Sequence, residues 1–157
     1  MADKDIHEAI ATAERFQGLS DEALDHLADH ARERNIESGD CLFRHGESAR
    51  NFFLLLEGRV SIEVPAVSGP TLTVQHLGPG KVLGWSWLLP PFRWSFNARA
   101  EQDCRVLEFD GRAILERCEA DPAFGYALIK QFSALMAERL DAAHRKMMDQ
   151  WSPPGFA

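Results

Sequence analysis

The chain has 157 residues, the length of one domain at about 100 to 200 residues per domain. Its 45% hydrophobic and 26% charged residues are typical of a soluble globular fold, and they exclude a disordered or collagen-like chain. The 17 basic and 24 acidic residues give a net charge of -7, and the basic residues are scattered, so the chain lacks the broad positive surface of a nucleic-acid-binding protein.

Three cysteines, Cys41, Cys104 and Cys118, are odd in number and have no CxxC spacing, which argues against a disulfide framework. The first 16 residues contain no continuous apolar segment of the kind that a signal peptide needs. The longest apolar run, residues 52–56, is far shorter than the ~20 residues of a spanning helix. These observations predict a cytoplasmic protein with no membrane partner.

The first predicted segment is helical and covers residues 6–34. The apolar positions recur at intervals of three and four residues, and Gly18 ends this first helix. They are Ile6, Ala9, Ile10, Ala13 and Phe16. Ser20 is a typical N-cap for a second helix, which we expect to run to about Arg34.

The hydrophobic period then changes from helical to strand-like over residues 36–109. Short apolar runs are separated by turn residues, which is typical of an antiparallel barrel or sandwich and not of a parallel α/β sheet. The runs cover residues 41–43, 52–56, 60–64, 71–76, 96–100 and 105–109. Between Gly84 and Ser95 the sequence WSWLLPPFRW carries three tryptophans and two adjacent prolines, and Pro90 and Pro91 cannot lie inside a central strand. We expect an irregular insert there.

Two helices are predicted over residues 110–150. Asp110 begins a short helix, and Asp121 followed by Pro122 is a favourable start for a long one. The apolar stripe of the long helix is longer than one barrel face needs, which predicts a homodimer contact. The residues assigned to this contact are Phe132, Leu135, Met136 and Leu140. The alternative is that the helix folds back on its own barrel.

The run from Ser38 to Val64, together with LGPGKVLG from Leu77 to Gly84, resembles the cyclic nucleotide-binding domain family. The resemblance includes a series of glycines at turn positions and the apolar residues between them. These glycines are Gly39, Gly46, Gly58, Gly78, Gly80 and Gly84. The resemblance covers residues 16–140 and implies one domain over 1–157, mainly β with flanking helices: N-terminal helices, a jelly-roll barrel and a long C-terminal helix.

The ligand motif departs from that family. The family has a glutamate after the last glycine, for the ribose, and an arginine followed by Ser or Thr, for the cyclic phosphate. Here Trp85 follows Gly84, and Trp94 and Ser95 occupy the other two positions. Ordinary cAMP or cGMP binding is therefore disfavoured, unless Arg93 or Arg99 replaces the missing arginine.

Two functions stay open at this point. The first is a sensor whose remodelled pocket binds a small molecule other than cAMP. The residues assigned to this pocket are Gly84, Trp85, Ser86, Trp87, Arg93, Trp94, Ser95 and Arg99. The second is a ligand-free scaffold, filled by its own tryptophans, that acts through an unidentified protein partner.

Other function classes are disfavoured. His26 and His30 stand four residues apart on the second helix, as two metal ligands could, but Leu27 after His26 breaks the HExxH pattern. The sequence has no catalytic motif and no cofactor fingerprint, so we expect neither an enzyme nor a metal or cofactor site. Many bacterial members of the family carry a helix-turn-helix domain after the long helix, but only nine residues follow Met148. We therefore expect no direct contact with DNA.

Overall fold

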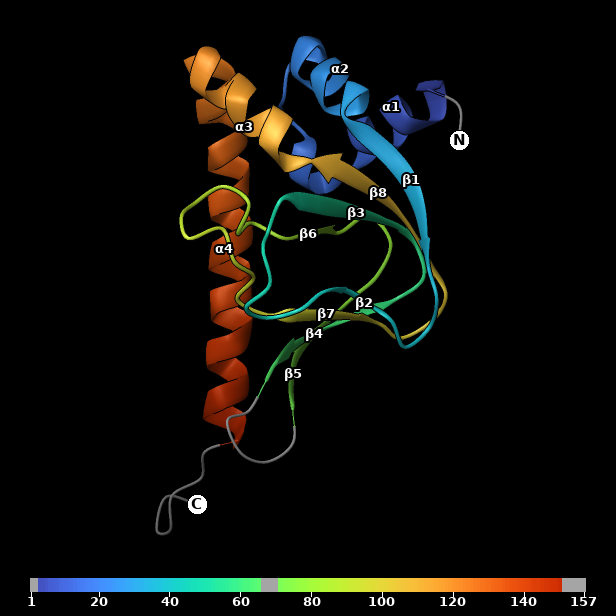
Figure 1. Cartoon of the computed structure of the whole chain (residues 1–157), viewed down its shortest axis with the longest axis vertical. Coiled ribbons are helices and arrows are strands. Elements are labelled where there is room, and N and C mark those ends of the chain that lie inside the picture. Colours follow the sequence, from blue (N-terminus) through green and yellow to red (C-terminus); the bar gives the residue numbers. More distant parts are fainter. Residues whose placement is uncertain (1–2, 66–70, 151–157) are drawn as a thin grey trace.

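The computed structural model describes residues 3–65 and 71–150. The strands form a two-layered barrel, α1 to α3 gather at one end of it, and α4 runs along one side (Figure 1). The predicted turn at residues 66–70 and the end of the predicted domain at residue 157 lie outside the described residues.

The N-terminal segment forms α1 (Asp3–Thr12), a 3-10 turn (Glu14–Phe16) and α2 (Asp21–Asp29). The hydroxyl of Ser20 accepts a hydrogen bond from the backbone N–H of Ala23 at 3.1 Å, which confirms it as the N-cap of α2.

The prediction that the second helix reaches Arg34 is wrong. The chain leaves α2 after Asp29 and forms β1 (Ala31–Ile36), which pairs antiparallel with β8. In a strand, Arg32 and Arg34 lie on the same face. Both guanidinium groups bind the buried carboxylate of Glu108 on β8, at 2.9 and 2.7 Å. The pairing partner, distant in sequence, therefore decides the conformation of this segment.

Within residues 3–65 and 71–150, eight strands form two four-stranded sheets, with the orders β1-β8-β3-β6 and β2-β7-β4-β5, and every pair is antiparallel. This arrangement confirms the predicted jelly roll with flanking helices. The other strands are β2 (Cys41–Phe43), β3 (Asn51–Glu57), β4 (Val60–Val64), β5 (Leu72–Leu77), β6 (Val82–Leu83), β7 (Asn97–Ala100) and β8 (Cys104–Asp110).

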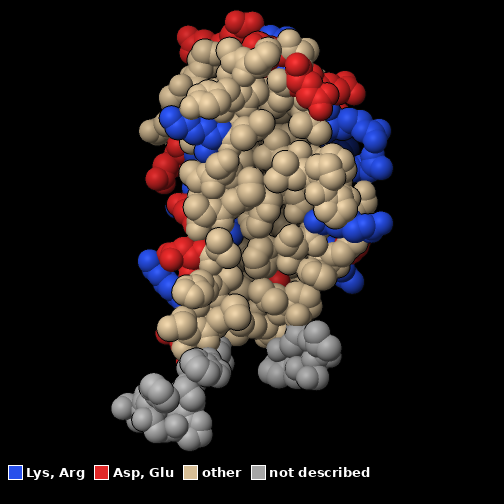
Figure 2. Space-filling model, turned by 90° about the vertical axis from the view of Figure 1, so that its left-hand side faces the viewer, with Lys and Arg blue, Asp and Glu red and all other residues tan. Residues whose placement is uncertain are grey.

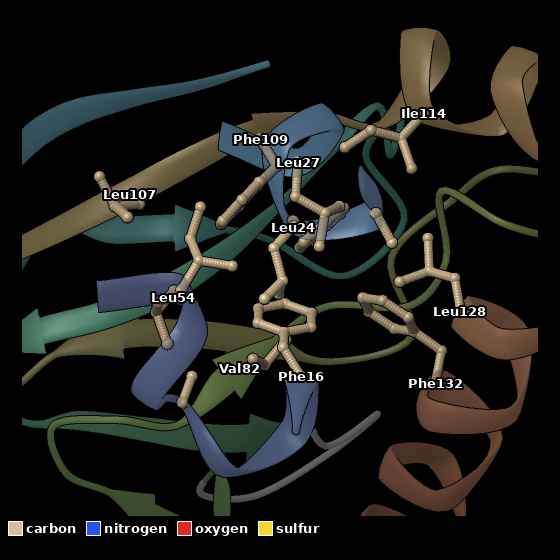
Figure 3. Close-up of a cluster of buried hydrophobic side chains, with 14 of the residues drawn as sticks. Phe16, Leu24, Leu27, Leu54, Val82, Leu107, Phe109, Ile114, Leu128 and Phe132 are labelled. Carbon is tan, nitrogen blue, oxygen red and sulfur yellow. The ribbon is translucent and has the colours of Figure 1, made fainter. Parts of the chain in front are cut away.

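Strand β3 divides two hydrophobic cores. Phe53 and Leu55 point into the barrel, whereas Phe52 and Leu54 point toward the helices, because successive side chains of a strand alternate between its faces. Both faces are covered, which explains why residues 52–55 are all apolar. Figure 3 shows the helix-side core, where side chains of the N-terminal helices, β3, β8 and α4 meet.

The C-terminal helices begin where the sequence indicates. The carboxylate of Asp110 accepts from Ala113 N–H at 3.2 Å at the start of α3 (Gly111–Ala120). The carboxylate of Asp121 accepts from Phe124 N–H at 3.3 Å at the start of α4 (Pro122–Gln150). None of the described helices combines the length and apolarity needed to cross a membrane.

Two of the four residues predicted for the dimer contact are buried inside their own domain, so the prediction is wrong for them. Phe132 and Leu135 are 0% and 1% exposed, and both belong to the helix-side core of their own domain. They cannot contact a second chain while the domain is folded. Met136 is half-buried, and Leu140 is 71% exposed on the outer face of the helix.

Candidate functional site

The segment between β6 and β7, residues 84–96, crosses the side of the barrel where we expected the ligand pocket. It starts at Gly84, whose φ of +97° is a conformation that residues with a Cβ rarely adopt. A Cβ at this position would lie 2.8 Å from Cζ3 of Trp94. The indole of Trp94 therefore rests directly against the backbone of Gly84.

Trp94 fills the barrel pocket. Its side chain is 6% exposed, and its ring stacks on Phe43 with centroids 3.9 Å apart and planes inclined by 14°. The cavity that remains has a volume of about 10 Å3, which is at the lower limit for one water molecule. It is lined by Phe43, Ile62, Gly84, Trp85, Ser86, Trp94, Ser95, Phe96 and Arg139.

The other two tryptophans of the segment lie elsewhere. Trp87 belongs to the helix-side core, with ring centroids 4.8 Å from Phe52 and 5.1 Å from Phe132, and its Nε1 donates to the carbonyl of Gly84. The expectation that Trp87 lines the barrel pocket is wrong, because the chain turns over the edge of the sheet at this point. Trp85 is half-buried and meets the ring of Phe96 edge-on at the pocket mouth.

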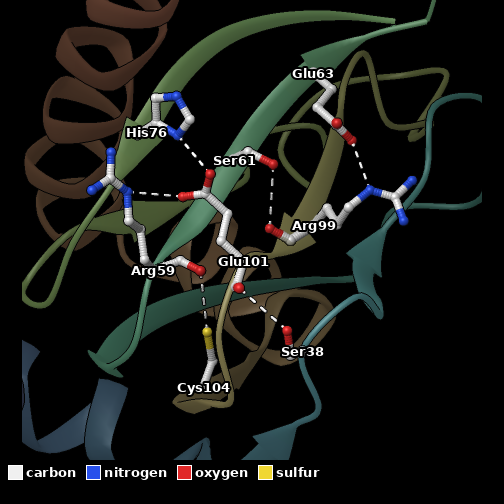
Figure 4. Close-up of polar contacts among 8 residues, drawn as sticks. All are labelled: Ser38, Arg59, Ser61, Glu63, His76, Arg99, Glu101 and Cys104. Carbon is white, nitrogen blue, oxygen red and sulfur yellow. Dashed lines mark hydrogen bonds and ion pairs between the residues drawn. The ribbon is translucent and has the colours of Figure 1, made fainter.

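Neither Arg93 nor Arg99 faces the cavity. Arg93 is exposed and donates from Nη1 to the carbonyl of Gly46 at 2.9 Å. Arg99 lies on the outer side of β7, where Nε donates to Glu63 at 3.1 Å (Figure 4). Its Nη1 donates to the carbonyl of Gly39 at 3.0 Å. The hydrogen bond to Glu63 raises the pKa of Arg99. In this structure both arginines therefore bond to groups on the outer surface and not to the cavity.

The cation that does line the cavity is Arg139, from the middle of α4, and the sequence analysis missed it. Its side chain is 3% exposed. Nη1 donates to Gln75 Oε1 on β5 at 3.2 Å, and Nη2 donates to the carbonyl of Val82 on β6 at 2.9 Å. Burial lowers the pKa of Arg139 to about 10.

A signal for Arg139 was present in the sequence. Buried positions on α4 follow steps of four and three residues at Leu128, Phe132 and Leu135, and the next step of four reaches Arg139. An arginine at a core position of an amphipathic helix needs an explanation, because buried cations are rare.

The remaining predicted residues divide between the interior and the surface. Ser86 is 8% exposed and Ser95 is exposed, and both border the cavity. The structure therefore brings together Gly84, Trp85, Ser86, Trp94 and Ser95. It leaves Trp87, Arg93 and Arg99 outside the cavity lining.

The chain combines an antiparallel jelly roll with helices at one end and an irregular segment across its side. Residues 33–121 match the model of the cyclic nucleotide-binding domain, so the chain belongs to this family. It is a cyclic nucleotide-binding-like regulatory domain.

Three further comparisons show what the chain is similar to. It is 27% identical to the cyclic AMP receptor protein of Thermus thermophilus over 128 residues, 82% of this chain and 57% of that protein. It is 35% identical to acetyltransferase Pat of Mycolicibacterium smegmatis over 75 residues, 48% of this chain and 22% of that protein. A cyclic nucleotide-binding domain from Methylobacillus flagellatus has the same fold, with a TM-score of 0.78 at 15% identity, covering 98% of this chain and 86% of that one. The chain thus spans only part of the curated relatives that it matches.

Proposed function

We propose that this domain is a regulatory module that responds to a small molecule other than a cyclic nucleotide, with Trp94 closing the pocket when the ligand is absent. The observation that carries this proposal is the buried guanidinium of Arg139 in the cavity lining. A buried charge is costly, and apolar residues of similar volume often stabilise a core better. A charge kept at a pocket is therefore a candidate for ligand recognition.

The same residues argue against cyclic nucleotides. Trp85 and Trp94 stand where the family has its ribose and phosphate partners, and Arg93 and Arg99 are engaged at the surface. Each lost charge-assisted hydrogen bond is worth about 1.5 to 3 kcal/mol, so two losses move a micromolar affinity into the millimolar range or beyond.

Two titrations test this proposal. Calorimetry with cAMP and cGMP is expected to give no saturable heat, and a dissociation constant below about 10 µM would contradict our assignment. A metabolite collection screened by tryptophan fluorescence is expected to contain a binder that raises the melting temperature, since a ligand at 100 times its dissociation constant adds about 2.7 kcal/mol.

A second candidate function is a ligand-free interaction module, and the small size of the remaining cavity favours it. Trp94 stacks closely on Phe43 and leaves about 10 Å3, as a permanent core residue would. If no compound in the screen changes the fluorescence or the melting temperature, this second candidate replaces the first.

Either function requires a surface through which the domain acts on another molecule. We propose that the outer face of α4 contacts a second copy of the chain. Tyr126, Leu140 and Met147 are 71%, 71% and 62% exposed, and they are separated by multiples of seven residues, the period of a coiled-coil seam. Ile129, 45% exposed, lies three residues after Tyr126 on the same face. The side of the molecule that carries α4 has few charged side chains near its centre (Figure 2).

Sedimentation of two variants tests the contact. Leu140→Glu is expected to convert a dimer into a monomer without loss of folding, because the new carboxylate must be desolvated in the contact. Leu89→Glu is the matched control, since Leu89 is 56% exposed but lies outside α4. An unmutated protein that sediments as a monomer at high micromolar concentration would contradict this proposal.

A further inference from the structure

The positive charge of Arg139 is poorly compensated. The two hydrogen bonds of its guanidinium go to neutral oxygens, on Gln75 and Val82. The carboxylate of Glu138 lies 4.0 Å from Nη1. That carboxylate is 53% exposed, and it is also bound by Arg15 at 2.5 Å.

The low pKa of Arg139 agrees with this geometry, because burial is its largest cause and the attraction of Glu138 offsets only part of it. A guanidinium carries five N–H donors in a planar fork that fits a carboxylate. An anion in the adjoining cavity would therefore gain a strong interaction, while an uncharged molecule would gain much less.

The shape of the site restricts the ligand further. The indole of Trp94 occupies a flat slot, with the ring of Phe43 stacked on it and the backbone of Gly84 in close contact. Gly84 has no side chain that could narrow this slot. Removal of the Trp94 ring would open a space of the same flat outline, bordered by Arg139 and by Ser86.

We propose that the ligand of this pocket is a flat aromatic carboxylate, which displaces the indole of Trp94, stacks on Phe43 and pairs its carboxylate with Arg139. This inference rests on the proposed function, since it requires a pocket that opens. In this proposal, Arg139 on α4 takes the part that the family gives to an arginine on the loop before β7. Binding would then change the contacts of Arg139 with β5 and β6, so the ligand would act directly on the helix that carries the proposed dimer contact.

The first experiment opens the slot by substitution and compares three probes of one ring system. Trp94→Ala is titrated with indole, indole-3-carboxamide and indole-3-carboxylate. The carboxamide matches the carboxylate in shape but has no charge. We expect the carboxylate to bind at least about tenfold more tightly than the carboxamide, because it gains a charge-assisted pair in a buried site.

Arg139→Gln in the Trp94→Ala background is expected to abolish that preference and to leave the binding of neutral indole unchanged. Glutamine keeps an amide donor that can serve the Val82 carbonyl but removes the charge. Arg139→Lys keeps the charge, and it is expected to retain part of the preference. The Trp94→Ala variant keeps Arg139. The comparison of its affinities for the carboxylate and the carboxamide therefore tests the proposal even if the double variants fold poorly.

The outcomes separate this inference from the proposed function. Equal affinity for carboxylate and carboxamide would overturn the anion assignment and leave a responsive pocket in place. No binding of any of the three probes to folded Trp94→Ala would overturn the pocket itself, and the proposed function with it.

The unmutated protein supplies the last test. With 5-fluorotryptophan in place of tryptophan, the fluorine resonance of Trp94 is expected to shift on addition of millimolar indole-3-carboxylate, while that of Trp87 stays in place. Trp94→Phe assigns the resonance. A Trp94 resonance that does not move would overturn displacement and favour the ligand-free module.

Discussion

Trp87 and Trp94 belong to one short segment, yet they occupy opposite sides of the sheet that contains β3. Trp87 lies among Phe52, Phe132 and other apolar side chains of the helix-side core. Trp94 lies in the barrel, stacked on Phe43 and bordering a cavity that Arg139 also lines. Trp94 shares its cavity with a buried charge, whereas Trp87 packs against aromatic rings and also lines a separate pocket with Arg50 and Arg112. Burial alone therefore does not identify a core residue. We expect the buried charge beside Trp94 to distinguish it, as a residue that closes a pocket, from Trp87 in the core.

The strongest test of this comparison is Trp87→Ala. Its side chain is 2% exposed and packs among aromatic rings, so the substitution removes these contacts and leaves a cavity in the helix-side core. We expect a loss of about 3 to 5 kcal/mol in the free energy of unfolding, measured by urea denaturation. Added indole is not expected to restore stability. A loss below about 1 kcal/mol would contradict the assignment of Trp87 to the permanent core.

Trp94→Ala is expected to cost less, at the lower end of the same range, about 3 kcal/mol. The new cavity borders Ser86, Arg139 and the exposed Ser95, so water can enter it and bind polar partners. Indole at millimolar concentration is expected to recover part of the lost melting temperature. If indole rescues Trp87→Ala equally well, the contrast between the two tryptophans fails.

Arg139→Met is expected to change the free energy of unfolding by no more than about 1 kcal/mol, in either direction. The substitution removes a buried charge with weak compensation, and this gain offsets the lost hydrogen bonds to Gln75 and Val82. Denaturation in urea measures the change. A loss of more than about 3 kcal/mol would show that Arg139 is a structural link between α4 and the barrel, and not a residue kept for a ligand.

The smallest effect concerns the thiols. Cys118 belongs to the helix-side core, and burial raises its pKa to about 11. A raised pKa keeps the thiol protonated at pH 8, so it is a poor nucleophile there. Alkylation by iodoacetamide at pH 8, followed by mass spectrometry, is therefore expected to modify the half-buried Cys41 well before Cys118. Labelling of both at the same rate would indicate that the helix-side core opens readily.

The pKa of Cys118 also predicts a dependence of stability on pH. The folded state keeps this proton up to about pH 11, whereas the unfolded thiol loses it near 9. The unfolded state then binds fewer protons between these values, so the contribution of Cys118 to stability falls as the pH rises from 9 to 11. Cys118→Ala is expected to remove that part of the slope in denaturation curves.

Local patterns account for most of the elements that the sequence predicted. The strands at 41–43 and 60–64 have the predicted bounds, because their apolar positions and flanking turn residues lie within a few residues of one another. The helix starts after Ser20, Asp110 and Asp121 were found for the same reason, since a cap bonds a backbone group only three residues away.

Elements that depend on distant partners were missed or misplaced. Residues 31–34 look helical by spacing, but the pairing of β1 with β8 and the buried carboxylate of Glu108 make them a strand. The two-residue strand β6 has too few residues to show a period, and its pairing with β3 defines it.

The sequence by itself determined the antiparallel strands of the barrel and the flanking helices, because these follow from residue types at short, regular spacings. Only the tertiary structure decided which tryptophan closes the barrel, and which arginine borders it. Trp87 and Trp94 differ in role because the segment crosses the edge of a sheet, and Arg139 reaches the cavity because α4 packs along the barrel wall. Trp94 lies 51 positions from Phe43, and Arg139 lies 64 positions from Gln75. Contacts between residues so far apart leave no local sequence pattern, because only packing in three dimensions brings the partners together.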